Sequence, residues 1–146
     1  MVLRWSKKLS RTDAQQPTGG YPVPYLRFTR SESSHDTQVW FRHSFFNGLN
    51  WQNSVFGQHP VEEADVAIEV IIHGNNLGLR QMTLTYDAGR RANNNTPTTY
   101  LHYDPQTVND LRNNNYTDDW VVLERTQQGH FHLSIQAGAP KPKHSP

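Results

Sequence analysis

A polar segment at residues 7–21, KKLSRTDAQQPTGGY, concentrates side chains that could bind a polyanion. Lysine and arginine neutralise phosphates, and hydroxyl groups and glycine N–H groups can approach phosphate oxygens closely. Glutamine suits the N6/N7 edge of adenine, and arginine suits guanine. The segment therefore predicts an arm that lies along a groove of DNA. A solvated N-terminal loop is the alternative interpretation.

A second segment of this kind spans residues 87–103, DAGRRANNNTPTTYLHY. Two adjacent arginines and three asparagines lead into a β-prone run that carries Tyr100 and His102. A polar loop of this length is longer than a hairpin needs, and such loops often carry function. We expect its donors and acceptors to read base edges, with Arg90 or Arg91 on phosphate or guanine. A surface loop built from turn-forming asparagines is the alternative.

Two other constellations suggest rival functions. The pairs His102-x-Asp104 and His130-x-His132 each place two potential metal ligands on one face of a strand, as a metal-dependent hydrolase would need. The segment at residues 40–56 combines Trp40, Trp51 and asparagines, which would suit stacking on sugars in a carbohydrate-binding β-sandwich. Period-2 histidines are more often exposed polar positions, and such tryptophans more often cover a core. No nucleophile-elbow or phosphate-loop motif is present.

Composition limits the class of protein. The 146 residues fit one domain, and the absence of cysteine excludes disulfides and thiolate metal sites. No apolar run approaches the roughly 18 residues that span a membrane, and the first residues lack the apolar core of a signal peptide. We therefore expect a cytoplasmic protein that needs no cofactor.

The net charge of +1 hides an uneven distribution along the chain. Residues 1–42 carry seven basic and three acidic side chains, whereas the charged side chains of residues 43–79 are four carboxylates. Such asymmetry within one domain predicts a basic side and an acidic side. A polyanionic partner is therefore compatible with the near-zero total charge.

Short β-prone runs separated by turns dominate the chain and predict a mostly β fold. A short helix is expected at residues 105–113, with Val108 and Leu111 facing inward, and a helical turn or two within residues 44–56. Residues 126–129, TQQG, read as a hairpin connection with Gly129 in the turn. Residues 1–138 are expected to form the domain, and residues 139–146 a linker or disordered tail. The expected strands are residues 21–29, 37–42, 65–73, 81–86, 98–103, 120–125 and 130–136.

The order of motifs in the first polar segment resembles a known family. Lys7-Lys8-Leu9-Ser10, then Asp13, then Thr18-Gly19-Gly20 is similar to the opening of the N-terminal effector-binding domain of the restriction endonuclease EcoRII. The resemblance returns faintly at residues 64–86 and 98–104 and ends with the closing hairpin. Thr12-Asp13 stands where the family has Asn-Asp, and Tyr21-Pro22 follows the two glycines in place of His-Gln.

The resemblance implies a seven-stranded, mixed pseudobarrel with one or two short helices, whose two arms clamp the major groove of duplex DNA. The implied partner is double-stranded DNA, with cleavage in a separate, fused nuclease domain and no catalytic residue here. The first arm would be Lys7, Lys8, Ser10, Arg11, Asp13, Thr18 and Gly19, and the second would be residues 90–102.

Within these arms we expect two kinds of contact. Phosphate contacts are expected from Lys7, Lys8, Arg30 and Arg91. Base contacts are expected from Arg11, Asp13, Gln15 or Gln16, Asn93, Asn94, Asn95, Tyr100 or His102. Arg90 is expected to contact either a phosphate or a base. A carboxylate such as Asp13 facing DNA would accept from cytosine N4 or orient a neighbouring arginine.

Overall fold

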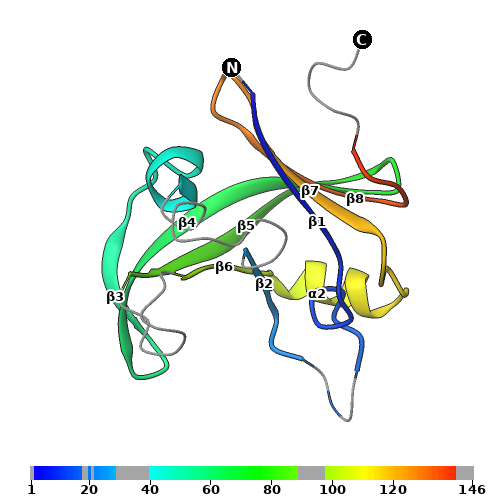
Figure 1. Cartoon of the computed structure of the whole chain (residues 1–146), viewed down its shortest axis with the longest axis horizontal. Helices are drawn as coiled ribbons and strands as arrows, with labels where there is room; N and C mark the ends of the chain where they lie inside the picture. The colour runs from blue at the N-terminus through cyan, green and yellow to red at the C-terminus, as the bar shows by residue number, and fades with distance from the viewer. Residues whose placement is uncertain (1, 18–19, 21, 29–39, 89–97, 141–146) are drawn as a thin grey trace. The chain divides into compact units, whose positions relative to one another are not determined.

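The computed structural model describes residues 2–17, 20, 22–28, 40–88 and 98–140 (Figure 1). These residues form eight strands and two helical segments. The chain divides into two compact units: the first comprises Met1–Val23, Ala67–Arg80 and Val108–Pro146, and the second comprises Pro24–Val66 and Gln81–Thr107. Two long strands, β4 (His59–Ile72) and β5 (Asn75–Asp87), contribute residues to both units.

The first unit contains β1 (Leu3–Lys8), β7 (Trp120–Arg125) and β8 (Phe131–Gln136). β1 pairs with β7 and β7 with β8, both antiparallel, whereas β8 runs parallel to the end of β4. Alternation along β8 buries Phe131, Leu133 and Ile135. The hairpin expected at residues 126–129 is confirmed, since Gly129 has a φ of 86° and its N–H donates to Thr126 O.

The β4–β5 connection in the first unit is a two-residue turn, His73–Gly74. Its φ angles are 48° and 82°, the signs that a type I′ hairpin turn requires. His73 is one of the non-glycine residues that adopts a positive φ, which costs conformational energy that the flanking strands must offset.

The second unit contains β2 (Tyr25–Arg27), β3 (Gln52–Phe56) and β6 (Thr98–His102). β3 pairs with the start of β4, and β6 pairs with both β5 and β2, all antiparallel. Leu26, Leu84 and Leu101 from three neighbouring strands are fully buried, so this face of the strands belongs to the core.

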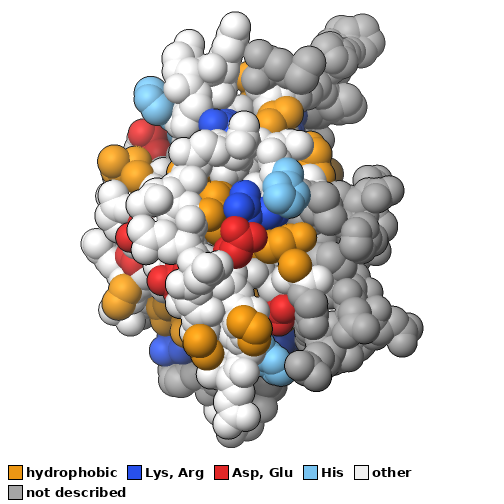
Figure 2. All heavy atoms as spheres, turned by 90° about the vertical axis from the view of Figure 1, so that its left-hand side faces the viewer, with side chains coloured by type: hydrophobic (Ala, Val, Ile, Leu, Met, Phe, Trp, Pro, Cys, Tyr) orange, Lys and Arg blue, Asp and Glu red, His pale blue; other side chains and the backbone are white. Residues whose placement is uncertain are grey.

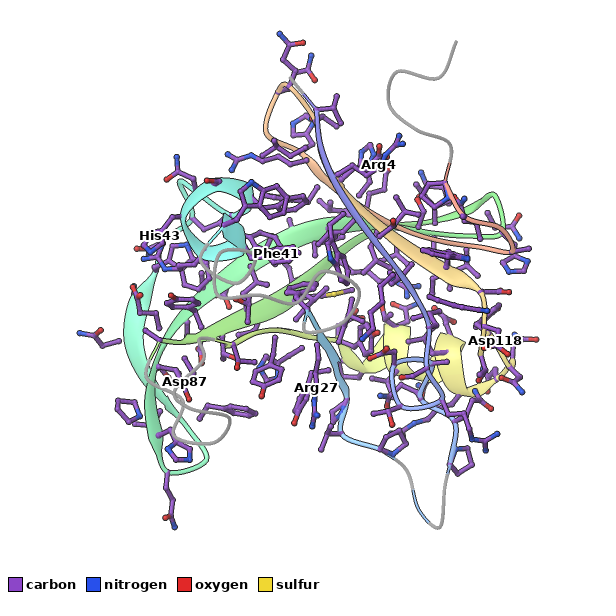
Figure 3. The ribbon with its side chains drawn as sticks, viewed as in Figure 1. Arg4, Arg27, Phe41, His43, Asp87 and Asp118 are labelled. Atoms are coloured by element: carbon purple, nitrogen blue, oxygen red, sulfur yellow. The ribbon has the colours of Figure 1, made fainter. Side chains whose placement is uncertain are left out.

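A five-residue π-helix, η1 (Phe41–Phe45), supplies the aromatic part of this core (Figure 3). Phe41, Phe45 and Phe46 are fully buried, and Phe41 stacks on Phe28 with ring centroids 4.3 Å apart. The strand expected at residues 37–42 is therefore wrong from Trp40 onward. Phe41, Phe45 and Phe46 all reach the core, whereas the alternation of a strand would send the consecutive residues Phe45 and Phe46 to opposite faces. Residues 37–39 lie outside the described residues.

The mostly β fold class with mixed strand pairing and short helices, expected for a pseudobarrel, is confirmed. The helix α2 (Pro105–Arg112) lies where it was expected and buries Val108 and Leu111. Asp104 holds its first turn, because Thr107 N–H donates to Asp104 Oδ2 at 3.3 Å. β3 is a strand that the polar sequence QNSVF did not predict. Of the expected tail, residues 141–146 lie outside the described residues.

Replacing the buried Phe41 by alanine should lower the free energy of unfolding by about 3–5 kcal/mol, because it leaves a cavity in the aromatic core. Urea unfolding followed by tryptophan fluorescence measures the change. The exposed His43 on the same segment is the matched control, and His43→Ala should cost at most about 0.5 kcal/mol. Equal losses in the two variants would contradict the assignment of Phe41 to the core.

Candidate functional site

The polar segment after β1 forms a closed turn that we call the arm loop, residues 8–16. Asp13 N–H donates to Ser10 Oγ at 3.1 Å, and Ser10 Oγ–H in turn donates to Asp13 Oδ2 at 2.9 Å. The backbone adds bonds from Ala14 N–H to Ser10 O (3.0 Å) and from Gln16 N–H to Arg11 O (2.9 Å). This reciprocal arrangement resembles a capping box and fixes the loop locally.

A buried ion pair lies beneath the arm loop. Lys7 Nζ and Asp13 Oδ2 are 2.7 Å apart, and their side chains are only 5% and 4% exposed. Strand alternation places Lys7 on the buried face of β1, two residues after the buried Trp5. Burying either charge without a partner would cost several kcal/mol, and the close contact between the two groups offsets part of that cost. The expected phosphate contact of Lys7 and base contact of Asp13 therefore receive no support from the structure.

The two glutamines tie the arm loop to the rest of the first unit. Gln15 is fully buried with a φ of 60°; its Nε2 donates to Val23 O at 2.8 Å, and its Oε1 accepts from Arg112 Nη2 at 3.2 Å. Gln16 Nε2 donates to Asn114 O at 2.7 Å. Both amides are thus occupied by protein partners, and base contacts from them likewise receive no support.

The start of the arm loop is held by backbone bonds to the residues before β7. Leu9 N–H donates to Asp119 O at 2.7 Å, and Asp118 N–H donates to Leu9 O at 3.0 Å. Asp118 adopts a φ of 73°, and its position is labelled in Figure 3. The loop is therefore fixed at both ends as well as from within.

The arm loop presents a small polar surface. Lys8, Ser10, Arg11 and Thr12 are exposed, and Arg11 Nη2 donates to Pro17 O at 2.9 Å. Of the basic side chains described within residues 1–42, three form ion pairs with carboxylates, namely Arg4 with Glu124, Lys7 with Asp13 and Arg42 with Glu62. The exposed cations in this part of the described chain are Lys8, Arg11 and Arg27.

Tyr100 and His102, expected in the second arm, belong to an aromatic cluster in the second unit together with Tyr25 and Phe56. Ring centroids are 4.6 Å apart for Tyr25 and Tyr100, 5.4 Å for Tyr25 and His102, and 5.1 Å for Phe56 and His102. The register explains the cluster, because β2 places Tyr25 opposite His102 on β6. Residues that face each other across strands share one face of the sheet.

Arg27 completes this surface. Its guanidinium carbon lies 5.5 Å from the ring centroid of Tyr25 and 6.0 Å from that of Tyr100, within the range of a cation–π contact. The register places Arg27 opposite Tyr100, and its side chain is exposed. Tyr25, Arg27 and Phe56 were not among the residues expected to contact DNA. The period-2 pairs Tyr25-x-Arg27 and Tyr100-x-His102 were the signal that could have joined them.

The environment of His102 favours its neutral form. Burial lowers the pKa of His102, and the carboxylate of Glu63 partly opposes that effect. A hydrogen bond of 2.9 Å joins His102 Nε2 and Thr85 Oγ1 and fixes the ring. The imidazole therefore acts at neutral pH as an uncharged aromatic ring.

Eight expected contact residues lie outside the described residues. They are Thr18, Gly19, Arg30, Arg90, Arg91, Asn93, Asn94 and Asn95. The expectations for these residues stay predictions.

The residues of the rival functions have other roles. The described residues contain no group of three or more His, Cys, Asp or Glu side chains that could hold a metal ion. Asp104 caps α2, and His132 lies 3.8 Å from Glu69. Trp51 stacks under Arg42 at 4.3 Å, and its Nε1–H donates to Phe46 O. Asp104, His132 and Trp51, three of the residues expected for a hydrolase or a carbohydrate-binding site, thus make contacts within the protein.

One face of the molecule shows basic, acidic, histidine and apolar side chains intermingled, without a continuous area of one charge (Figure 2). Charge alone therefore provides no extended track for a polyanion on that face. On that face, contacts to a polyanion would have to come from individual charged side chains.

Comparison of the chain with protein-family models, with curated proteins and with solved structures finds no match. The resemblance to EcoRII-type domains therefore stays a prediction. Among the described helices, none has the length and apolar character needed to cross a membrane.

Breaking the buried ion pair should destabilise the protein strongly. Lys7→Met should lower the free energy of unfolding by about 3–5 kcal/mol, because it leaves the Asp13 carboxylate buried without its counter-charge. Lys8→Met is the matched control and should cost at most about 0.5 kcal/mol, since Lys8 is exposed. Urea unfolding measures both changes.

The double variant Lys7→Met/Asp13→Asn separates charge from packing. It removes both charges while keeping an oxygen that can accept from Ser10, so it should recover part of the lost stability. A double variant that is less stable than Lys7→Met would contradict this account of the pair.

His102 should titrate below the pKa of the same residue in the urea-unfolded protein, which NMR of its ring protons can measure. Because the folded-state pKa is the lower one, the unfolded state binds the proton more tightly. Stability should therefore fall as the pH drops from about 6.5 towards the folded-state pKa and should level off below it. His102→Gln should flatten this dependence. A higher pKa in the folded protein would overturn the prediction.

Proposed function

We propose that this chain binds duplex DNA in a sequence-specific manner, as the recognition or effector domain of an EcoRII-type restriction endonuclease. In this proposal the protein acts in the cytoplasm, and cleavage resides in a separate nuclease domain. The fold class is compatible with the proposal, since the resemblance implies a mixed, mostly β domain. The observation that carries the proposal is the construction of the arm loop.

The arm loop has the features of a pre-organised phosphate and base contact. Interior bonds through Asp13, Gln15 and Gln16 hold it rigid, so little conformational entropy would be lost on binding. Its outer surface offers two cations, Lys8 and Arg11, beside the hydroxyls of Ser10 and Thr12. Proteins use these groups to contact DNA phosphates, and they use arginine to read guanine.

The structure changes how the roles in this loop are divided. Lys8 is the proposed phosphate contact and Arg11 the proposed base contact. Lys7, Asp13, Gln15 and Gln16 support the loop from below, because their polar groups bond within the protein. The second arm, with Arg90, Arg91 and the three asparagines at 93–95, is retained as part of the proposal, and so is the phosphate contact expected from Arg30.

Selection of bound oligonucleotides from a random duplex pool tests the proposal directly. We expect enrichment of one short sequence, and an affinity that falls steeply as salt rises, because phosphate contacts release counterions. Enrichment of no sequence would remove the claim of specificity. Failure to bind duplex would overturn the proposal. Binding that ignores salt would also overturn it and would favour a carbohydrate ligand.

Two variants separate the roles within the loop. Lys8→Ala should weaken all duplex sequences alike and reduce the salt slope by about one, whereas Arg11→Ala should cost about 1–3 kcal/mol and relax one position of the selected site. Gln127→Ala, in the exposed β7–β8 turn of the same unit, is the control and should change neither quantity. Identical binding by all three variants would contradict the role of the arm loop.

A further inference from the structure

The aromatic cluster lies on the face of the second unit's strands that is opposite to its core. Leu26 alternates with Tyr25 and Arg27 along β2, and it is fully buried whereas Arg27 is exposed. Likewise, Leu101 alternates with Tyr100 and His102 along β6 and is fully buried. Since neighbouring residues of a strand point to opposite faces, the rings line the outer face.

The neighbouring strand shows the same division. β5 places Leu84 opposite the buried Leu101, and Thr83 and Thr85 opposite His102 and Tyr100. The outer face therefore carries hydroxyls and aromatic rings, and the inner face carries aliphatic side chains. The accessible part of this face consists of the exposed Arg27 and the half-buried Tyr25, Phe56 and His102, whereas Thr85 and Tyr100 are buried.

This face combines a stacking surface with a cation. Tyr25, Phe56 and His102 are half-buried, and Tyr100, whose ring contacts all three, is buried. Arg27 is exposed at the edge of the rings, and its Nη2 donates to Tyr25 Oη at 3.4 Å. Two carboxylates on β4 bond to neighbouring hydroxyls: Glu63 accepts from Ser54, and Asp65 accepts from Thr83.

The aromatic rings and the guanidinium of this surface indicate the class of ligand that it could bind. Aromatic rings beside a guanidinium suit a flat, apolar ring that is attached to an anion. A nucleobase with its phosphate has this form, and base–aromatic stacking is the common mode of binding for unpaired nucleotides. Bases within an intact duplex stack on each other and cannot present their faces to a protein ring.

We infer that Tyr25, Phe56 and His102 form a platform on which an unpaired nucleobase stacks, with its phosphate on Arg27. This inference rests on the proposed function in that the partner is nucleic acid. It goes further by assigning a second contact, in which a base outside the duplex stack is bound. Thr85 acts as a positioning residue, because its hydroxyl holds the His102 ring.

The test uses DNA that contains the fluorescent base 2-aminopurine in three settings: a single strand, a fully paired duplex, and a duplex with the probe in a one-base bulge. Stacking on protein rings should quench the probe in the single strand and change its emission in the bulge, while the fully paired probe should not respond. Fluorescence anisotropy of a second, end-attached dye reports binding itself, independently of stacking.

Substitutions at Tyr25 and Arg27 assign the effect to the platform. Tyr25→Phe should keep the quenching, whereas Tyr25→Leu, which keeps an apolar side chain, should weaken binding of the single strand by about 5-fold or more. Arg27→Met should weaken it similarly, and Arg27→Lys should recover only part, because a point charge cannot stack. Val55→Ala, at the exposed neighbour of Phe56, is the control, and thermal melting confirms that each variant folds.

The outcomes separate this inference from the proposed function. Duplex binding without a probe response in the single strand or bulge would overturn the platform alone. A response that depends on Tyr25, in a protein that does not bind duplex, would support the platform and overturn the proposed function. Quenching that is unchanged in Tyr25→Leu, or binding of neutral sugars with the same dependence on Tyr25, would also overturn the platform. Absence of all DNA binding would overturn both.

Discussion

The buried pair of Lys7 and Asp13 is the interaction on which the N-terminal part of the molecule depends. Asp13 accepts from the hydroxyl of Ser10 while it neutralises Lys7, so one carboxylate links the end of β1 to the turn that follows. In a poorly solvated position this pairing is close to obligatory, since either charge alone would be strongly unfavourable. The geometry of the arm loop is thus imposed from inside the protein, and its outward side chains need not be restrained by a ligand.

The buried ion pair shows that a basic segment can contain cations that are not available to a partner. Lys7, Lys8 and Arg11 lie within five residues in the sequence and look equivalent by composition. In the structure one cation is internal and two face solvent. The same holds for the basic first third of the chain, where Arg4 and Arg42 are paired with carboxylates. Net local charge therefore overstates the number of cations that a polyanion could meet.

The sequence predicted well where a local pattern decides the structure. Three features of this kind are local. β8 follows from its alternating apolar residues, the β7–β8 turn from Gly129, and the start of α2 from its proline. It failed where distant partners decide. β3 has little pattern of its own and forms by pairing with the start of β4, and η1 is helical because its phenylalanines reach a core that includes Phe28.

The sequence indicated which polar side chains the arm loop contains, but it did not indicate which of them face solvent and which bond within the protein. The alternation of Trp5, Lys7 and Leu9 was visible in the sequence and places Lys7 on the buried face of β1, but a lysine is rarely expected there. The burial of Gln15 could not be predicted from local sequence, because its hydrogen-bond partners Val23 and Arg112 lie outside the arm loop. The platform likewise depends on a strand register that residues 25–27 alone do not determine.

The pairing of β1 with β7 affects the order in which parts of the protein fold during synthesis. It joins Leu3 to Arg125 and Lys8 to Trp120, so β1 has no partner during translation until residues 120–125 have been synthesised. Contacts of such long sequence separation form late, because a large loop must close first. The residues of β1 therefore stay unpaired while the segment between β1 and β7 is synthesised. The arm loop directly follows β1, so it would become able to bind a partner only after β7 has formed.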